Sequence, residues 1–245
     1  MTDDSPLLPA LADALKTALS APPTRILPLS VDGRRYWLKR PERHRSLLRR
    51  MQKGDPARAI EADRAGLRRM AALGLPAPRL LASGADFLLT EDVGAPVATL
   101  LRDPSATEAD RHAALADGAR ALAALHQAGV AHGRPKIRDV CWAPDRGAAF
   151  IDFEEFREPA DTAALARDAM VYLHSVLQLR RQRDALFDTA AEAYRAAAPA
   201  GVWEAMRIRV ARIRWIAPLA RLVLWVQPKA HEVRAALLLH AALGD

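Results

Sequence analysis

The amino-acid sequence predicts an α+β fold with a small, strand-containing N-terminal part and a larger helical C-terminal part. Short strand-like runs separated by turn residues precede a linker at residues 90–94. Beyond the linker, long segments rich in alanine and leucine favour helices, since β-branched runs are few. With 245 residues, 51% of them hydrophobic, the chain can bury a substantial core.

Turn and capping signals define the elements of the N-terminal part. Asp32-Gly33 suits a tight hairpin, because both positions tolerate positive φ. Asp55 followed by Pro56 is typical of a helix start, and Gly74 ends that helix. The sequence therefore predicts, in order, a helix over 7–20, strands over 25–31 and 34–40, a helix over 55–73, and strands over 79–82 and 87–90.

The C-terminal part is predicted to be helical around one loop-rich insert. A helix runs from Thr107 to Ala128 and stops at Gly129. The insert covers 131–156 with short strands, and three or more helices fill 161–243. We expect a single domain of two lobes, a small one over about 1–92 and a helical one over about 93–245.

Charge and cysteine content restrict the class of protein. The net charge of +7 and pI near 10.1 suggest an anionic partner, although a general preference for arginine explains the bulk charge equally well. Cys141 is the only cysteine, which excludes a disulfide within the chain, and we expect it to be a small core residue. The acidic N-terminus lacks the basic flank of a secretory signal, and no apolar stretch is long enough to span a membrane. We expect a cytoplasmic protein, which could lie at the inner face of the membrane.

The insert carries the residues that point to chemistry. An apolar strand ends at Asp152, and the polar loop before it offers Lys136 and Asp139. Carboxylates supply the hard oxygen ligands that Mg²⁺ prefers, and an ammonium offsets the charge of a terminal phosphate. Asp152 alone would more often be a strand-end turn residue, but its separation of thirteen residues from Asp139 favours the functional interpretation.

The same residues resemble the catalytic motifs of the protein kinase-like superfamily. Its catalytic loop reads H-R-D-x-x-x-x-N and is followed by D-F-G. Here His132 matches the histidine, Asp139 the asparagine, and the run Asp152-Phe153-Glu154 the D-F-G. The resemblance extends over about residues 24–178 and is greatest to the bacterial lipopolysaccharide (Kdo/WaaP-type) kinases and the aminoglycoside-phosphotransferase-like proteins. It implies a kinase-like two-lobed fold that binds ATP and Mg²⁺.

The resemblance also implies a role for individual residues. The D-F-G aspartate binds metal, the lysine of the third strand contacts phosphates, and backbone groups of the hinge bond adenine. The implied residues are Asp152 and Asp139 on the metal, Lys39 and Lys136 on the phosphates, Glu91 and Val93 on the adenine, Asp168 as the buried brace of the catalytic loop, and His132 as a structural residue of that loop.

The partner of Lys39 is left open by the sequence. In the alternating strand, Tyr36 and Leu38 share one face and Lys39 lies on the other. Glu61 or Asp63, on the following helix, would orient the lysine. The two carboxylates lie about 200° apart on a helix, so only one can face it. Lys39 could instead be a solvated strand lysine among its arginine neighbours, but the nearby carboxylates favour a functional pair.

Three departures from the family pattern affect the predicted activity. Arg134 stands where active kinases carry the catalytic aspartate, and an arginine cannot accept a proton. Asp139 replaces the asparagine, which keeps an oxygen ligand and adds a charge. Gly33 is the only glycine in the first fifty residues, so no glycine-rich lid is recognisable. Phosphoryl transfer relies mainly on positioning and charge neutralisation, so Asp139 could act as the base, or Arg134 could stabilise the transferred group.

The sequence thus predicts an atypical ATP-dependent phosphotransferase. Its acceptor would be a hydroxyl of a sugar, a lipopolysaccharide precursor or a protein. A pseudokinase that binds nucleotide or a partner without phosphoryl transfer is the alternative. Binding of nucleic acid is not expected, because the helical half contains no recognisable nucleic-acid motif.

Two basic regions remain to be assigned. The segment 34–53 could recognise phosphates on an anionic sugar or lipid acceptor, but we prefer a solvated connection before the helix. Arg207, Arg214 and Arg221 recur every seven residues near Trp215 and Trp225, which suggests a peripheral membrane contact. We expect packing within the helical lobe instead, because apolar residues occupy several sides of that segment.

Overall fold

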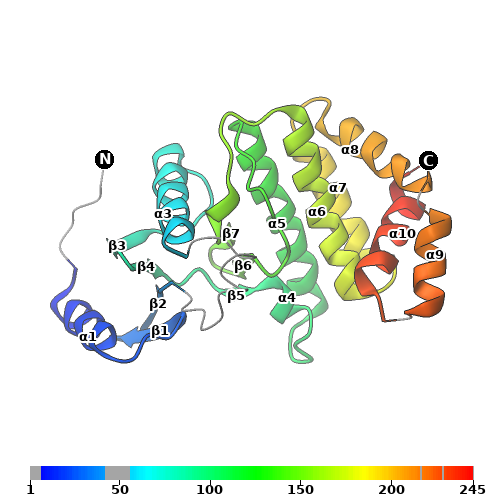
Figure 1. Ribbon diagram of the computed structural model, residues 1–245. Coiled ribbons are helices and arrows are strands. Elements are labelled where there is room, and N and C mark those ends of the chain that lie inside the picture. The colour runs from blue at the N-terminus through cyan, green and yellow to red at the C-terminus, as the bar shows by residue number, and fades with distance from the viewer. Residues whose placement is uncertain (1–6, 42–55, 216, 228, 245) are drawn as a thin grey trace. The chain divides into compact units, whose positions relative to one another are not determined.

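The computed structural model describes residues 7–41, 56–215, 217–227 and 229–244, which form two compact units (Figure 1). Unit 1 consists of the chain up to Val93 together with Asp152–Glu155. Unit 2 consists of Gly94–Ile151 and of the chain from Phe156 onward. The chain therefore leaves unit 2 after Ile151, contributes four residues to unit 1, and returns.

Unit 1 is built on a four-stranded antiparallel sheet in the order β1-β2-β4-β3. The hairpin between the first two strands turns at Asp32 (φ 49°) and Gly33 (φ 72°), so the predicted turn is confirmed. Ser83 and Gly84 belong to a strand rather than to the turn between strands. The elements of unit 1 are α1 (Pro9–Ser20), β1 (Ile26–Val31), β2 (Arg34–Lys39), α3 (Pro56–Leu73), β3 (Leu80–Gly84), β4 (Phe87–Glu91) and the short 3-10 helix η1 (Phe153–Glu155).

Helix α1 covers one face of this sheet. Its buried residues Leu11, Leu15 and Ala18 recur at helical spacing, which places them on one stripe. They pack on the sheet residues Tyr36 and Leu38, which alternate along β2 as the sequence predicts. A fully buried leucine side chain contributes about 1.5–3 kcal/mol to stability, so this layer fixes β2 and the lysine at its end.

Helix α3 begins at Pro56 and ends before Gly74, which has φ 64° and suits the left-handed end of a helix. The expected N-cap Asp55 lies outside the described residues. Ile60, Leu67 and Met70 form its buried stripe, and Asp63 lies on the same stripe. An acidic residue is thereby carried into the interior of unit 1.

Unit 2 is mainly helical and contains a small antiparallel sheet in the order β5-β6-β7. Thr107 caps the long helix by accepting a hydrogen bond from the amide of Asp110, and Ala128 follows its last residue, which confirms the predicted helix. The elements are β5 (Ala95–Pro96), α4 (Val97–Leu100), α5 (Glu108–Gln127), β6 (Val140–Ala143), β7 (Gly147–Phe150), α6 (Thr162–Arg180), α7 (Ala185–Ala197), α8 (Val202–Ala211), η2 (Arg212–Trp215), α9 (Ala217–Val226) and α10 (His231–Leu243).

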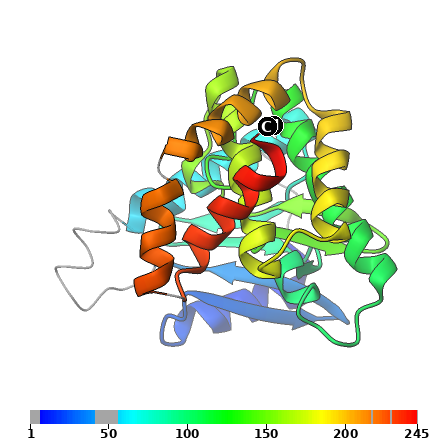
Figure 2. The same ribbon diagram turned by 90° about the vertical axis from the view of Figure 1, so that its right-hand side faces the viewer.

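The core of unit 2 lies between α5, α6 and α7. Tyr172 is fully buried and donates a hydrogen bond to the carbonyl of Leu115 at 2.9 Å. Burial raises the pKa of the Tyr172 hydroxyl, so the group stays protonated and remains a donor. Cys141 is buried on β6, as expected of a small core residue. Toward the C-terminus, α10 lies beside α9 (Figure 2).

Two expectations about the basic regions can be compared with the structure. The expectation that Trp215 and Trp225 pack inside the helical part is wrong, because they are 76% and 80% exposed. Arg207 donates to the carbonyl of Leu243, whereas the side chain of Arg221 lies outside the described residues. Residues 42–53 of the basic segment 34–53 also lie outside the part of the chain that the structure describes. Within the described part, none of the helices has the length and apolar character required to cross a membrane.

Candidate functional site

A cluster of charged side chains in unit 1 forms around Lys39, the last residue of β2. Its ammonium contacts Asp63 Oδ2 at 2.8 Å and Glu154 Oε1 at 2.9 Å, and it also pairs with Asp152. The lysine side chain is 14% exposed. Strand β2, helix α3 and the segment Asp152–Glu155 therefore bring one cation and three carboxylates together within unit 1.

Of the two carboxylates left open by the sequence, Asp63 is the one that contacts Lys39. Its second oxygen, Oδ1, accepts a hydrogen bond from the backbone amide of Phe153 at 2.8 Å, so both oxygens are used as acceptors. Glu61 instead pairs with Arg64 on the same helix, and its side chain is 63% exposed. Asp63 thus joins the lysine of β2 to the segment that follows β7.

Burial and neighbouring charges shift the pKa values of Lys39 and Asp63 in opposite directions. Burial by itself lowers the pKa of Lys39, but the attraction of Asp63, followed by that of Asp152 and Glu154, raises the pKa overall. Burial raises the pKa of the Asp63 carboxyl, and the Lys39 ammonium offsets part of that shift. Because both oxygens of Asp63 accept hydrogen bonds, the geometry corresponds to the ionised carboxylate.

Asp152 has a backbone conformation that is uncommon for a residue with a side chain. Its φ of 67° lies in the left-handed region, which aspartate and asparagine enter more readily than most residues. The next residue, Phe153, is fully buried in unit 1. The buried ring and the Asp63 hydrogen bond hold the segment, and Asp152 and Glu154 remain 27% and 24% exposed at their side chains.

One carboxylate of this cluster, Asp152, suits a magnesium ion that is shared with a phosphate ligand. Three carboxylates against one ammonium leave two formal negative charges, which match a divalent cation. Among the described residues there is no group of three or more His, Cys, Asp or Glu arranged to hold a metal ion. Mg²⁺ commonly uses only one or two carboxylates and completes its coordination with water and substrate phosphates, so the oxygens of Asp152 suit it.

The loop that resembles the catalytic loop belongs to unit 2 and is held by buried polar groups. Asp168 on α6 is 1% exposed and accepts a hydrogen bond from the amide of Gly133 at 3.0 Å. His132 Nε2 lies 2.9 Å from the carbonyl of Ile151, the last residue of unit 2 before the Asp152 segment. Asp139 is buried, and its carbonyl accepts from the amide of Ile151 at 2.9 Å. The loop is thus fixed to both α6 and the end of the β7 segment.

Arg134 and Lys136 lie on the same loop with different surroundings. The amide of Arg134 is 3.4 Å from His132 Nδ1, and its carbonyl accepts from the amide of Lys136 at 2.9 Å. The side chain of Lys136 lines a pocket that is formed entirely by unit 2. The contact of Lys136 with nucleotide phosphates stays a prediction, and in the structure its side chain lines this pocket.

Glu91 and Val93, the residues implied for adenine, lie at and after the end of β4. The Glu91 amide donates to the Arg79 carbonyl at 3.2 Å, and its Oε1 accepts from the Arg79 amide at 3.1 Å, so the side chain helps to fix the local turn. Nearby, Asp92 accepts a hydrogen bond from the indole of Trp37 at 3.1 Å. The backbone of Val93 makes no hydrogen bond with other residues in the described ranges.

Sequence reasoning missed one member of the Lys39 cluster. Glu154 stands at the glycine position of the D-F-G motif, and the sequence showed this substitution without indicating a contact. Its contact with Lys39 depends on η1, which turns the chain directly after Asp152. A third carboxylate within two residues of a predicted metal ligand is the signal that could have identified it.

Comparison with known proteins defines the class to which this chain belongs. Residues 24–210 match the phosphotransferase enzyme family (APH), which is well over half of the chain. The chain therefore belongs to this family of the protein kinase-like superfamily, and its α+β architecture is the kinase-like one. An uncharacterized protein of Haemophilus influenzae is 27% identical over 194 residues, which is 78% of this chain and 79% of that protein.

Solved structures with similarity to this chain include three of WbdD. The bifunctional kinase-methyltransferase WbdD gives a TM-score of 0.43 at 19% identity and covers 68% of this chain and 41% of its own. WbdD with the kinase inhibitor LY294002 gives 0.46 at 18% identity, covering 75% and 48%. Monomeric WbdD gives 0.43 at 17% identity, covering 66% and 42%. The chain therefore spans less than half the length of these proteins.

Proposed function

We propose that this protein is an ATP-dependent phosphotransferase that transfers a phosphoryl group to a hydroxyl of a sugar, a lipopolysaccharide precursor or a protein. The observation that carries the proposal is the Lys39 cluster. A buried lysine held at 2.8 Å by a carboxylate of a neighbouring helix is what positions an ammonium against nucleotide phosphates in kinase-like enzymes. The family membership supports the same activity.

The proposed roles follow from the chemistry of each group. Magnesium bound with ATP would neutralise the charge of the transferred phosphoryl group. In this proposal the metal ligands are Asp152 and Asp139, the phosphate ligand is Lys39 oriented by Asp63, and the adenine contacts are the backbone groups of Glu91 and Val93. His132 and Asp168 hold the loop on which Arg134 supplies positive charge.

Thermal unfolding with and without ligands tests the nucleotide site. ATP and Mg²⁺, together at about a hundred times the Kd, should add about 2.7 kcal/mol of apparent stability. The matched variant is Asp152→Asn, because asparagine tolerates the positive φ of this position whereas alanine would be strained. The control is Glu108→Gln, which alters an exposed carboxylate of unit 2.

The expected result is a rise in Tm that needs both ATP and Mg²⁺, is lost in Asp152→Asn and persists in Glu108→Gln. Transfer of ³²P from ATP to a bacterial glycolipid extract or to water then tests turnover. The absence of any shift in the wild type would refute nucleotide binding at this cluster. Binding without turnover would refute the phosphotransferase proposal.

Arg134 supports a second candidate function, that of a pseudokinase. A general base contributes about 10²–10⁴-fold to enzymatic rates, and arginine cannot fill that role. The two candidates differ in one experiment, because Arg134→Asp restores a base at this position. An increase in turnover of about 10²-fold or more in this variant supports a pseudokinase that lost its catalytic activity together with the general base. A decrease supports an active enzyme in which Arg134 stabilises charge.

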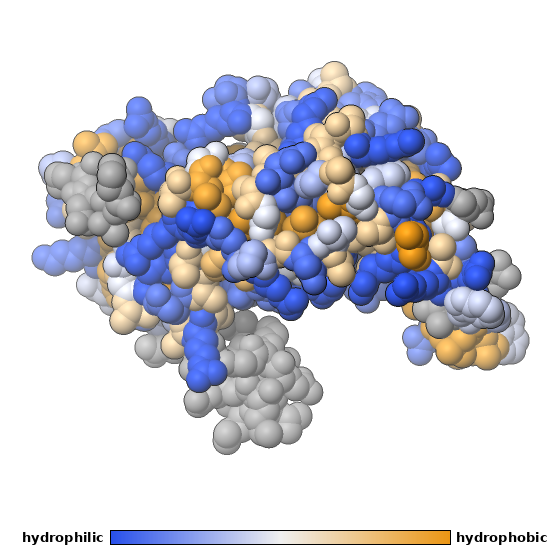
Figure 3. All heavy atoms as spheres, turned by 90° about the horizontal axis from the view of Figure 1, so that it is seen from above, coloured by the Kyte–Doolittle hydropathy of each residue, from blue (hydrophilic) through white to orange (hydrophobic). Residues whose placement is uncertain are grey.

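The exposed hydrophobic side chains near the C-terminus support a peripheral membrane contact. Trp215, Leu219, Leu222 and Val226 follow one another at helical spacing, and each is more than half exposed. Figure 3 shows hydrophobic side chains gathered on the surface over α9. Exposed arginines of η2 flank this stripe, and the guanidinium of Arg214 lies 4.9 Å from the ring centroid of Trp215.

We therefore propose that this stripe lies against an anionic membrane surface, which would place the protein at the cytoplasmic face. Apolar side chains with adjacent arginines are typical of helices that bind in the interface of an anionic bilayer. Co-sedimentation with vesicles of phosphatidylglycerol should retain the wild type and release Trp215→Ser/Leu222→Ser. Equal retention by vesicles of neutral phosphatidylcholine, or by the double variant, would contradict the proposal.

A further inference from the structure

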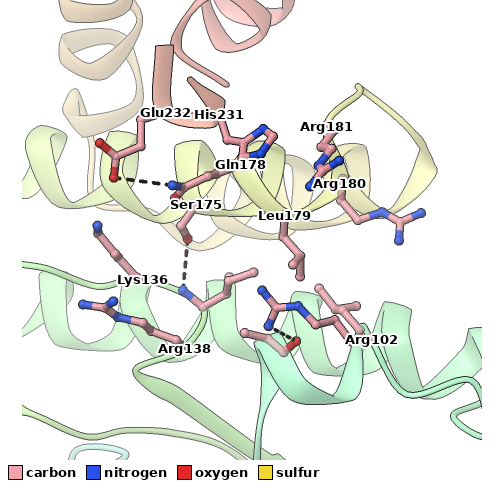
Figure 4. Close-up of a pocket in the computed structure, with 13 residues that line it drawn as sticks. Arg102, Lys136, Arg138, Ser175, Gln178, Leu179, Arg180, Arg181, His231 and Glu232 are labelled. Atoms are coloured by element: carbon pink, nitrogen blue, oxygen red, sulfur yellow. Dashed lines mark hydrogen bonds between the residues drawn. The ribbon is translucent and has the colours of Figure 1, made fainter. Parts of the chain in front are cut away.

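A basic pocket of unit 2 has no role in the nucleotide site described above. It has a volume of about 580 Å³ and lies between α4, the loop after His132, the end of α6 and the start of α10 (Figure 4). All of its lining residues belong to unit 2. Its cations are Arg102, Lys136, Arg138, Arg180 and Arg181, with Glu232 as the only lining carboxylate.

Three of these cations have no carboxylate partner among the described residues. Arg102 donates to the carbonyl of Ala98 at 3.0 Å, and neither Lys136 nor Arg181 makes an ion pair in the described ranges. By contrast, Arg180 pairs with Asp184 at 2.8 Å. Three elements far apart in the sequence therefore contribute cations without a carboxylate partner to the lining of one cavity (Figure 4).

The floor of the pocket is held by hydrogen bonds rather than by the cations. The carbonyl of Ile137 accepts from the amide of Ala98 at 3.1 Å, which ties the loop to α4. The amide of Ile137 donates to the hydroxyl of Ser175 on α6 at 3.0 Å, and that hydroxyl donates to the carbonyl of Tyr172 at 2.7 Å. Because these groups fix the loop, the charged ends of the cations are left for a ligand.

Two polar residues at the start of α10 complete the lining. Glu232 accepts a hydrogen bond from Gln178 at 3.4 Å, which draws its carboxylate toward α6. His231 Nδ1 is buried, and no described residue is a hydrogen-bond partner for it. A buried ring nitrogen without a partner is costly unless a ligand or water pairs with it.

We propose that this pocket binds a sugar that carries phosphate or carboxylate groups, and that this sugar is the phosphoryl acceptor. Arginine and lysine are the side chains that recognise phosphates and carboxylates. The volume lies in the range of small-molecule sites, about 300–1,000 Å³, and exceeds what a single inorganic phosphate fills. Lys136 and Arg138 lie three residues and one residue before Asp139 in the chain, so the ligand would lie beside the catalytic-type loop of unit 2. The acceptor role rests on the proposed phosphotransferase function, whereas anion binding does not.

Isothermal titration of the full chain tests the pocket with four probes: glucose 6-phosphate, 6-phosphogluconate, glucose and inorganic phosphate. The test variant is Arg102→Gln/Arg181→Gln, which removes two unpaired cations that take no part in the nucleotide site. The control is Arg120→Gln, an arginine of unit 2 outside the pocket whose side chain is 61% exposed and pairs with Asp117. Loss of a charge-assisted hydrogen bond weakens binding about tenfold or more.

The expected result is that the charged sugars bind about tenfold or more tightly than either glucose or inorganic phosphate. Their binding should weaken about tenfold or more in the double variant and change less than about twofold in Arg120→Gln. Equal affinity for inorganic phosphate and the charged sugars would overturn the proposal of a sugar site. Unchanged binding by the double variant, or no binding of either charged sugar, would overturn the proposal that this pocket is an anion-binding site.

The same proteins separate this inference from the nucleotide proposal. The double variant should keep the rise in Tm with ATP and Mg²⁺, because neither arginine belongs to the Lys39 cluster. If the charged sugars bind but no Mg·ATP shift is seen in the wild type, the anion site stands and the acceptor role is refuted. If the double variant loses the Mg·ATP shift as well, the assignment of the two arginines to a separate site is refuted.

Discussion

Removal of the Asp63 carboxylate should destabilise unit 1 more than removal of either of the other two carboxylates that contact Lys39, because Asp63 is the most deeply buried of the three. The side chain of Asp63 is only 4% exposed, and it accepts hydrogen bonds from Lys39 and from the amide of Phe153. The substitution Asp63→Ala removes both acceptors at once. The matched control Glu61→Gln lies on the same helix but changes an exposed ion pair.

The magnitude follows from the two contacts that are lost. A hydrogen bond to a charged group contributes about 1.5–3 kcal/mol, and a buried amide left without a partner costs about 1–3 kcal/mol. Removing one partner of a buried ion pair costs about 3–5 kcal/mol when the other charge is left alone. Lys39 keeps Asp152 and Glu154, so we expect about 3 kcal/mol for Asp63→Ala. The exposed control should cost about 0–1 kcal/mol.

The substitution Asp63→Asn separates the two contributions. Its amide oxygen can still accept from Phe153, so about half of the loss should be recovered. Urea unfolding followed by ¹⁹F NMR of 5-fluorotryptophan measures this locally, because Trp37 lies in unit 1 and the other tryptophans lie in unit 2. The reasoning is wrong if the Trp37 signal shifts its midpoint equally in Asp63→Ala and Glu61→Gln.

Three further predictions concern other contacts. The pKa of Lys39 is raised by its carboxylate neighbours, so acylation of this lysine by an amine-reactive reagent should begin at higher pH in the wild type than in Asp63→Asn. Peptide mass spectrometry measures the extent of acylation at each pH, and identical profiles for the two proteins would argue against the Lys39–Asp63 contact. In Gly118→Ala the new Cβ would lie 2.7 Å from the Tyr172 hydroxyl, so the free energy of unfolding should fall by about 1–3 kcal/mol. The fall should be smaller in a Tyr172→Phe background, and additive losses in a double-mutant cycle would exclude the contact. Gly94→Ala would place Cβ against the backbone carbonyl of Trp142 at φ 102°, so urea unfolding should show a loss of about 3 kcal/mol or more. A loss below about 1 kcal/mol would refute the close approach.

The elements of the fold were predictable where local chemistry determines them. Asp32-Gly33 needs positive φ at both positions, and few other dipeptides supply it, so the hairpin could be placed from two residues. Thr107 and Gly129 similarly define the long helix of unit 2 through a side-chain cap and a left-handed end. The exposure of Trp215 and Trp225 was not predictable, because apolar residues on several sides of a segment do not reveal which side meets a neighbour.

Individual residues of the site could be predicted from their local sequence, but not which residues from distant parts of the sequence come together. The choice between Glu61 and Asp63 depends on helical phase, and Asp63 shares the buried stripe of Ile60 and Leu67. An acid within an apolar stripe was therefore a usable signal. No comparable signal existed for the basic pocket, since Arg102 and Arg181 come together only through the packing of α4 against the loop and α6. Charge density along the sequence drew attention to segment 34–53 instead.

The end of α6 has a consequence for engineering this protein. Arg181 follows the helix at φ 61°, a conformation that costs a non-glycine residue about 1–2 kcal/mol, and its amide donates to the carbonyl of Leu177 at 2.7 Å. Arg181→Gly would relieve this cost and keep the amide, while it removes a cation from the pocket. A screen that selects only for thermal stability would therefore favour a variant that binds the pocket ligand more weakly. Stability and ligand binding should be selected together.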